Sequence, residues 1–160
     1  MKINKFILSR VKNVIFISLV MLSTVKFANA EAMPLIISTP SQITFSQKEG
    51  TSKGTPDMPG VSTKVLFGDP AKAGLTTVIV RISPHTRFQP LTHPNDGFVT
   101  VLSGRWYVGF GQTFDSSGLK ALKPGDFYTE PGNAFHYAET RAEPAIVAVT
   151  TAEPGGLISK

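Results

Sequence analysis

The sequence predicts an all-β protein, built as an antiparallel sandwich or barrel. From residue 62 onward, short runs rich in Val, Ile, Thr and aromatic residues alternate with turn signals. Beyond the first thirty residues, no stretch keeps an apolar period of 3.6 over more than two turns, so few helices are expected. A short turn at Pro70–Lys72 is the one exception that we expect.

Each predicted strand ends at a residue pair that favours a tight turn, such as Ser103-Gly104 or Pro124-Gly125. The expected strands of the domain are Lys64–Gly68, Leu75–Ile82, Phe98–Leu102, Arg105–Phe110, Leu119–Leu122, Phe127–Thr129, Phe135–Thr140 and Ala145–Thr151. Two short leading strands are expected at Pro34–Ser38 and Gln42–Ser46, and Gln47–Val61 is a loop by composition. The sequence therefore predicts N-terminal strands and a loop over 31–61, and one barrel domain over 62–160.

The first thirty residues have the composition of a secretory signal peptide. Four basic residues precede the apolar run Val14–Val25, and Ala28-Asn29-Ala30 follows it. The alternative is a retained membrane anchor, but the run spans only about a dozen residues where a spanning helix needs about 20. We expect cleavage after Ala30, a periplasmic or secreted protein, and no membrane association after cleavage.

The charge of the predicted mature chain is balanced. The whole sequence has 16 Lys and Arg against 11 Asp and Glu, and five of the basic residues lie in the leader. Residues 31–160 therefore carry no net charge, which argues against a nucleic-acid partner or an anionic membrane surface. The sequence has no cysteine, so disulfides and thiolate chemistry are excluded.

Side-chain alternation assigns faces in the run Arg105–Phe110. Trp106 shares one face with Val108, and Tyr107 lies on the other. We expect Trp106 in the core, and Tyr107 either in a cavity wall or on the surface. The expected core positions are Val99, Val101, Trp106, Val108, Ile146 and Val149.

Three residues, Gly125, Pro131 and His136, stand at intervals that resemble the second motif of the cupin superfamily. In that motif Gly is followed by five residues, Pro-any-Gly, two residues, His, three residues and Asn. Asn133 takes the place of the inner Gly, and Thr140 takes that of the closing Asn. The resemblance covers Val65 to Thr151 and implies a jelly-roll β-barrel with few or no helices.

The first cupin motif is altered. In its family form it has Gly, five residues, His-any-His, three or four residues, Glu, six residues and Gly. Gly104 sets the register and places His93 at the second His. The other positions have changed, because His85 stands for the opening Gly, Leu91 for the first His and Gly97 for the Glu.

The resemblance therefore implies two metal-ligand positions, His93 and His136, where metal-binding cupins have three His and one Glu. We weigh Asp96 and Gln89 as auxiliary ligands, since Asp96 adjoins the vacated Glu position and Gln89 shares strand parity with residues 91 and 93. His85 is expected at an exposed turn with no ligand role. The expected pocket residues are Leu91, Gly97 and Tyr107.

Three hypotheses about function follow. The first is a small-molecule-binding cupin whose metal site is degenerate, with His93 and His136 hydrogen-bonded remnants. The second is a metal-dependent oxygenase or isomerase of a small organic substrate, in which His93 and His136 hold a divalent transition metal. The third is a structural barrel that forms a homodimer and whose cavity is filled by side chains. The sequence identifies no ligand, metal or catalytic residue.

Overall fold

The structure, a computed structural model, describes residues 33–45, 58–152 and 158–159. The chain divides into two compact units, Met1–Ile36 and Ile37–Lys160. In the first, only residues 33–36 are described, and they are exposed and irregular. No helix within the described ranges is both long and apolar enough to cross a membrane. The leader predicted at 1–30 lies outside them.

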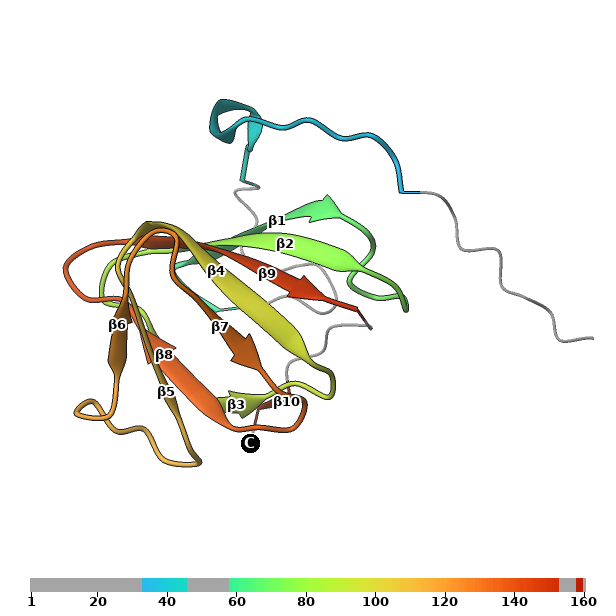
Figure 1. Cartoon of the computed structure of the whole chain (residues 1–160). Coiled ribbons are helices and arrows are strands. Elements are labelled where there is room, and N and C mark those ends of the chain that lie inside the picture. The colour runs from blue at the N-terminus through green and yellow to red at the C-terminus, as the bar shows by residue number, and fades with distance from the viewer. Residues whose placement is uncertain (1–32, 46–57, 153–157, 160) are drawn as a thin grey trace, which may run out of the picture. The chain divides into compact units, whose positions relative to one another are not determined.

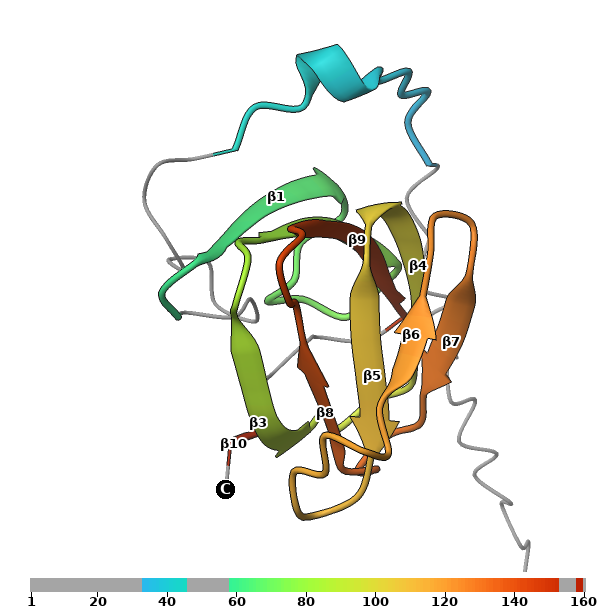
Figure 2. The same ribbon diagram turned by 90° about the vertical axis from the view of Figure 1, so that its left-hand side faces the viewer.

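The second unit is built from two antiparallel sheets that face one another (Figure 1). One sheet has the order β1-β2-β9-β4-β7, and the other has the order β10-β3-β8-β5-β6. Figure 2 shows the second sheet in front of the first. The elements are η1 (Pro40–Gln42), β1 (Val61–Phe67), β2 (Thr76–Ile82), β3 (Arg87–Thr92), β4 (Gly97–Gly104), β5 (Trp106–Phe110), β6 (Lys120–Leu122), β7 (Phe127–Glu130), β8 (His136–Glu139), β9 (Ala145–Thr151) and β10 (Ile158–Ser159). The predicted all-β class and jelly-roll architecture are confirmed.

The eight strands expected after residue 62 are all present, with ends shifted by up to three residues. The two leading strands were wrong for the residues that the structure describes, since 34–38 are irregular and a short 3-10 helix occupies 40–42. Pro40 suits the first position of a helical turn. The Thr39 amide donates to Gln42 Oε1 at 2.8 Å, which closes this turn locally. A local turn therefore replaced the expected extended structure.

The register of the first sheet arranges its inner face in rows. Thr76, Thr151, Gly97 and Glu130 are successive cross-strand partners on β2, β9, β4 and β7. The next row toward the interior is Val78, Val149, Val99 and Tyr128. A polar row thus lines one end of the interior, and apolar rows lie behind it.

The core lies between the sheets. Val61, Val99, Val101 and Ile82 are the largest side chains that are fully buried. Burial of each of these side chains contributes roughly 1.5 to 3 kcal/mol to the stability of the fold. Of the six expected core residues, Val99, Val101, Trp106 and Val108 are buried.

Ile146 and Val149 are only partly buried. They lie three residues apart, so in a strand of period two they point to opposite faces. Val149 faces the interior, as does Val147, which is the more deeply buried of the two.

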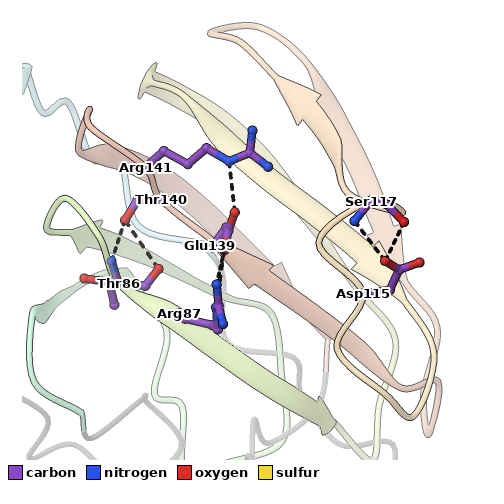
Figure 3. Close-up of polar contacts among 7 residues, drawn as sticks. All are labelled: Thr86, Arg87, Asp115, Ser117, Glu139, Thr140 and Arg141. Atoms are coloured by element: carbon purple, nitrogen blue, oxygen red, sulfur yellow. Dashed lines mark hydrogen bonds and ion pairs between the residues drawn. The ribbon is translucent and has the colours of Figure 1, made fainter.

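On the outer side of the second sheet, polar contacts join residues of neighbouring segments (Figure 3). Glu139 is buried, and its carboxylate accepts hydrogen bonds from Arg87 and Arg141. Thr140, at the place of the motif's closing Asn, accepts the Thr86 amide proton and donates to the Ser83 carbonyl. A hydroxyl therefore ties the start of β3 to the end of β8.

Candidate metal and ligand site

Three side chains converge at one end of the interior. His93 follows β3, Glu130 ends β7 and His136 begins β8. His93 Nε2 lies 3.4 Å from Glu130 Oε2, and His136 Nε2 lies 3.4 Å from Glu130 Oε1. The imidazole rings stack with their centroids 5.0 Å apart. One potential ligand atom from each residue lies within 4.8 Å of the other two, which is the spacing of a small metal-binding group.

The orientation of His136 is set by the backbone. Its Nδ1 lies 3.4 Å from the carbonyl oxygen of Ala134, which can only accept a hydrogen bond. In the tautomer that donates from Nδ1 to this carbonyl, Nε2 presents a lone pair toward Glu130 Oε1, 3.4 Å away. With that tautomer, a metal ion between the two acceptor atoms would be bound by both.

Glu130 is held by donors from the core. The Tyr128 hydroxyl donates to Glu130 Oε1 at 3.1 Å, and the Trp106 indole Nε1 donates to the Tyr128 oxygen at 3.1 Å. Burial of the hydroxyl raises the pKa of Tyr128 well above its usual value, and the negative charge of Glu130 adds to this rise. The phenol therefore stays protonated and keeps donating to the carboxylate.

The position of His93 depends on contacts between two loops. The backbone N–H of Asn133 donates to the His93 carbonyl oxygen at 2.6 Å, and the backbone N–H of Gly132 donates to Asp96 Oδ1 at 2.7 Å. Asn133 has a φ of 62°, the left-handed conformation that asparagine tolerates better than other side-chain-bearing residues. These contacts hold the β3–β4 loop, with His93, against the β7–β8 loop between Glu130 and His136.

The cluster lines a cavity of about 110 Å³ between the two sheets. The side chains at the other positions are mainly apolar or aromatic, with Thr76, Thr151 and Asn95 as polar exceptions. Phe88 and Trp106 meet edge to face in the wall, with ring centroids 5.5 Å apart. The apolar and aromatic lining residues are Pro70, Val78, Val80, Ile82, Phe88, Leu91, Pro94, Val99, Trp106, Tyr128, Ala138, Val147 and Val149.

The structure brings four of the expected site residues to this cavity. His93 and His136 face one another across Glu130, and Leu91 and Gly97 line the wall beside them. Leu91 is the direct cross-strand partner of His136, so the first histidine position of the motif has become an apolar wall. His85 is exposed, with a φ of 57°, as expected of a turn residue.

Asp96, Gln89 and Tyr107 lie elsewhere. Asp96 accepts the Gly132 amide proton and is outside the ligand cluster. Gln89 is exposed, and the expectation that it faces the interior was wrong because β3 has an irregularity between Phe88 and Leu91 that reverses the alternation.

Tyr107 is absent from the cavity lining, which corrects the expectation that it is a pocket residue. It lies on the outer side of β5, where the Arg141 guanidinium covers its ring at 4.2 Å. The surface alternative for Tyr107 therefore holds.

Sequence reasoning missed Glu130. Its only signal was alternation in β7, which puts Glu130 on the face of Tyr128 and opposite to Phe127 and Thr129. That signal is weak, because both faces of this four-residue strand carry an aromatic residue.

Comparisons with known proteins agree with the fold. The family model of the ChrR cupin-like domain matches residues 51–154. A cupin-2 domain protein from Rhodospirillum rubrum is similar over 81% of this chain and 82% of its own, with 17% identity and a TM-score of 0.55. An RmlC-like cupin from Shewanella frigidimarina is similar over 75% and 93%, with 16% identity and a TM-score of 0.53.

An enzyme has a comparable fold as well. Salicylate 1,2-dioxygenase from Pseudoaminobacter salicylatoxidans is similar over 59% of this chain and 25% of its own, with 13% identity and a TM-score of 0.50. A comparison with curated proteins finds no match. The family model covers well over half of the sequence and agrees with the second motif and the two facing sheets. The chain therefore belongs to the ChrR cupin-like family of the cupin superfamily.

Proposed function

We propose that this cupin holds a divalent transition metal ion at His93, Glu130 and His136 and binds a small molecule in the adjoining cavity. The observation that carries the proposal is the convergence of two imidazole nitrogens and one carboxylate oxygen within 4.8 Å in the lining of a mostly apolar cavity. Two histidines and one carboxylate are a recurrent donor set for iron and related metals, and they leave coordination positions open.

The surroundings of the three residues fit this role. Histidine ligands commonly donate a hydrogen bond from their second ring nitrogen to a backbone carbonyl, and His136 Nδ1 lies 3.4 Å from the Ala134 carbonyl oxygen, where it can do so. Carboxylate ligands are themselves hydrogen-bonded, as Glu130 is by Tyr128. The side chains are also protected from solvent, since the exposed fractions of Glu130 and His136 are 8% and 7%.

Catalysis by an oxygenase or isomerase extends this proposal. A metal ion at such a site supplies Lewis acidity or oxygen activation to a substrate at its open positions. The apolar wall would exclude water around that substrate, and Tyr128, held by Trp106, would keep Glu130 in place. The similar fold of salicylate 1,2-dioxygenase supports this extension.

A second candidate is a cavity that binds its ligand without metal. Leu91, the cross-strand partner of His136, has no atom that could bind a metal ion. If His93 and His136 were protonated, each would form an ion pair with one Glu130 oxygen. The polar group of the ligand would then bind the histidines directly, and a chelator would not weaken its binding.

The decisive experiment is elemental analysis of the exported protein, purified without chelator or metal-affinity resin. We expect about one equivalent of a transition metal in the parent and in Glu143→Gln, a control at an exposed carboxylate. Glu130→Gln and His93→Ala/His136→Ala should lose the metal. Retention of metal by the double variant, or a parent that stays empty when titrated with Zn²⁺, Fe²⁺ and Mn²⁺, would contradict the metal proposal and favour the second candidate.

Export to the periplasm or beyond is also part of this proposal, supported by the leader composition. The mass of the same purified protein tests it, because cleavage after Ala30 gives a chain that begins at Glu31. A cellular protein that keeps Met1–Ala30 would contradict it.

The structural hypothesis expected a cavity filled by side chains, whereas a cavity of about 110 Å³ remains. A homodimer stays a proposal, which light scattering tests.

A further inference from the structure

The outer face of the first sheet carries an uncharged strip over β9, β4 and β7, which run side by side (Figure 1). Side chains alternate along a strand, so the residues between the inward-facing ones point to this face. Antiparallel sheets that have one face in water usually carry polar and charged residues on that face, whereas no residue of the strip is charged. The strip consists of Ile146, Ala148 and Thr150 on β9, Phe98, Thr100 and Leu102 on β4, and Phe127 and Thr129 on β7.

Three large apolar side chains of the strip are exposed. The exposed fractions are 68% for Phe127, 47% for Phe98 and 45% for Leu102. Contiguous exposed apolar residues mark interaction surfaces, and the buried centres of protein–protein interfaces are poor in charged residues and rich in aromatic ones. The strip therefore has the composition of an interface centre.

Over β2, the same face of the sheet is buried by the chain itself. Ile79 lies in one cross-strand row with Thr100 and Phe127, yet its exposed fraction is only 2%. Phe45 packs over the neighbouring Arg81, whose guanidinium carbon lies 3.9 Å from the ring centroid. The apolar face is thus covered at β2 and exposed at β4 and β7, where a partner has room to dock.

A hollow of about 400 Å³ adjoins the strip at one end, and its surface is mostly apolar. The acidic residues of its lining, Asp96 and Glu130, already accept hydrogen bonds within the chain. Phe127 lies one cross-strand row away from the hollow, two residues before Thr129 on β7. One face therefore offers both a projecting ring and a hollow, whose lining includes Leu75, Phe98, Thr129 and Thr150.

These features select a second copy of this chain as the partner. A two-fold axis brings the same patch together from both sides, so the patch must be complementary to itself. A face without charges meets this condition, because it places no like charges opposite one another. A ring that projects beside a hollow meets it too, since each copy can fill the hollow of the other.

We infer that two copies of this chain pack through the strip, sheet face against sheet face, with Phe127 of each copy seated in the hollow of the other. Sheets that pack in this way lie about 10 Å apart and interdigitate the side chains between them. The inference does not depend on the proposed metal site, because the strip lies on the opposite face of the sheet from the cavity.

The size of the strip predicts a weak dimer. Three strands and about seven residues along them give a face of about 14 by 23 Å, or about 320 Å² in plan. Each partner of a standard interface buries about 800 Å². We therefore expect a Kd of about 1 to 100 µM.

The test is sedimentation velocity of the exported protein from about 1 to about 300 µM, in EDTA so that no metal ion can bridge two copies. We expect monomer at the lowest concentration and dimer at the highest. Phe127→Ser removes the projecting ring and should raise the Kd about 10- to 100-fold, as expected for a central aromatic residue of an interface. Phe127→Leu keeps an apolar side chain and should retain most of the affinity.

Leu75→Ser changes the wall of the hollow and should also weaken the dimer, since Leu75 is 44% exposed there. Phe110→Ser is the matched control, because Phe110 is a 53% exposed phenylalanine on β5 of the other sheet. This control should keep the Kd of the parent.

Two results would overturn the inference. One is a parent that stays monomeric at the highest concentration, as it would if another part of this chain covered the strip. The other is a dimer that Phe127→Ser weakens no more than Phe110→Ser does. Phe127→Ser should bind as much Zn²⁺ as the parent, so the failure of this inference and that of the metal proposal are measured separately.

Discussion

Gly97 and Glu130 are direct cross-strand partners at the point where β4 and β7 meet. Gly97 stands where the cupin resemblance expects a carboxylate ligand, and Glu130 supplies a carboxylate from the neighbouring strand. Adjacent strands lie about 4.8 Å apart, within the reach of a glutamate side chain. The carboxylate that is absent from β4 is therefore offered to the two histidines from β7.

This pairing predicts that a carboxylate at position 97 can replace the carboxylate of Glu130 as a metal ligand. Gly97→Glu/Glu130→Gln should regain part of the metal affinity that Glu130→Gln loses, as measured by Zn²⁺ calorimetry. Recovery should be partial, because a Cβ at position 97 would lie 3.1 Å from Thr151 Cγ2 and would require a small shift. The control is Thr129→Glu/Glu130→Gln, which puts the carboxylate on the outer face of β7. Equal recovery in both double variants would show a general charge effect instead.

We predict that Asp96 supports metal binding indirectly, by holding the β3–β4 loop against the β7–β8 loop, and that it is not itself a metal ligand. Asp96→Ala removes the acceptor of the Gly132 amide and loosens the contact that positions His93. Losses of supporting contacts around metal ligands typically lower metal affinity by about 10- to 100-fold, and we expect the low end for this exposed hydrogen bond. Asp96→Asn keeps an acceptor oxygen and should retain the parent affinity. Equal affinities in the alanine and asparagine variants would refute this role.

The raised pKa of Tyr128 predicts a dependence of stability on alkaline pH. The folded state holds the phenol proton more tightly than the unfolded chain, so this contribution is present below about pH 10 and is lost as pH rises through the folded pKa. Tyr128→Phe cannot titrate. The difference in unfolding free energy between metal-free parent and variant should therefore shrink as pH rises above about 10. Urea unfolding at neutral and alkaline pH measures it, and a constant difference would contradict the assignment.

The core predicts a contrast between two faces of the first sheet. Val101 is fully buried, so Val101→Ala should lower the free energy of unfolding by about 2 to 3 kcal/mol through lost burial and a new cavity. Ile146 is partly buried, and Ile146→Ala should cost less although it removes more atoms. Chemical denaturation of the two variants gives both values. A larger loss for Ile146 would mean that the faces of β9 are wrongly assigned.

The sequence by itself determined the fold class and the positions of eight of the ten strands in the described part of the chain, all except β3 and β10. Alternating apolar runs and turn residues act locally, within one strand or one turn, and these features located β1, β2 and β4 to β9. The same local logic placed His85 at an exposed turn. The intervals from Gly125 to His136 also identified the superfamily, which the family model confirms.

Only the tertiary structure decided the composition of the site. The pairing of Gly97 with Glu130 joins residues far apart in sequence, and no local pattern contains it. Because of the irregularity in β3, Gln89 faces outward. Asp96 binds the backbone N–H of Gly132 and lies outside the histidine cluster. Strand register and side-chain direction change with each single-residue shift, so they are set by pairing between strands and not by the composition of any one of them.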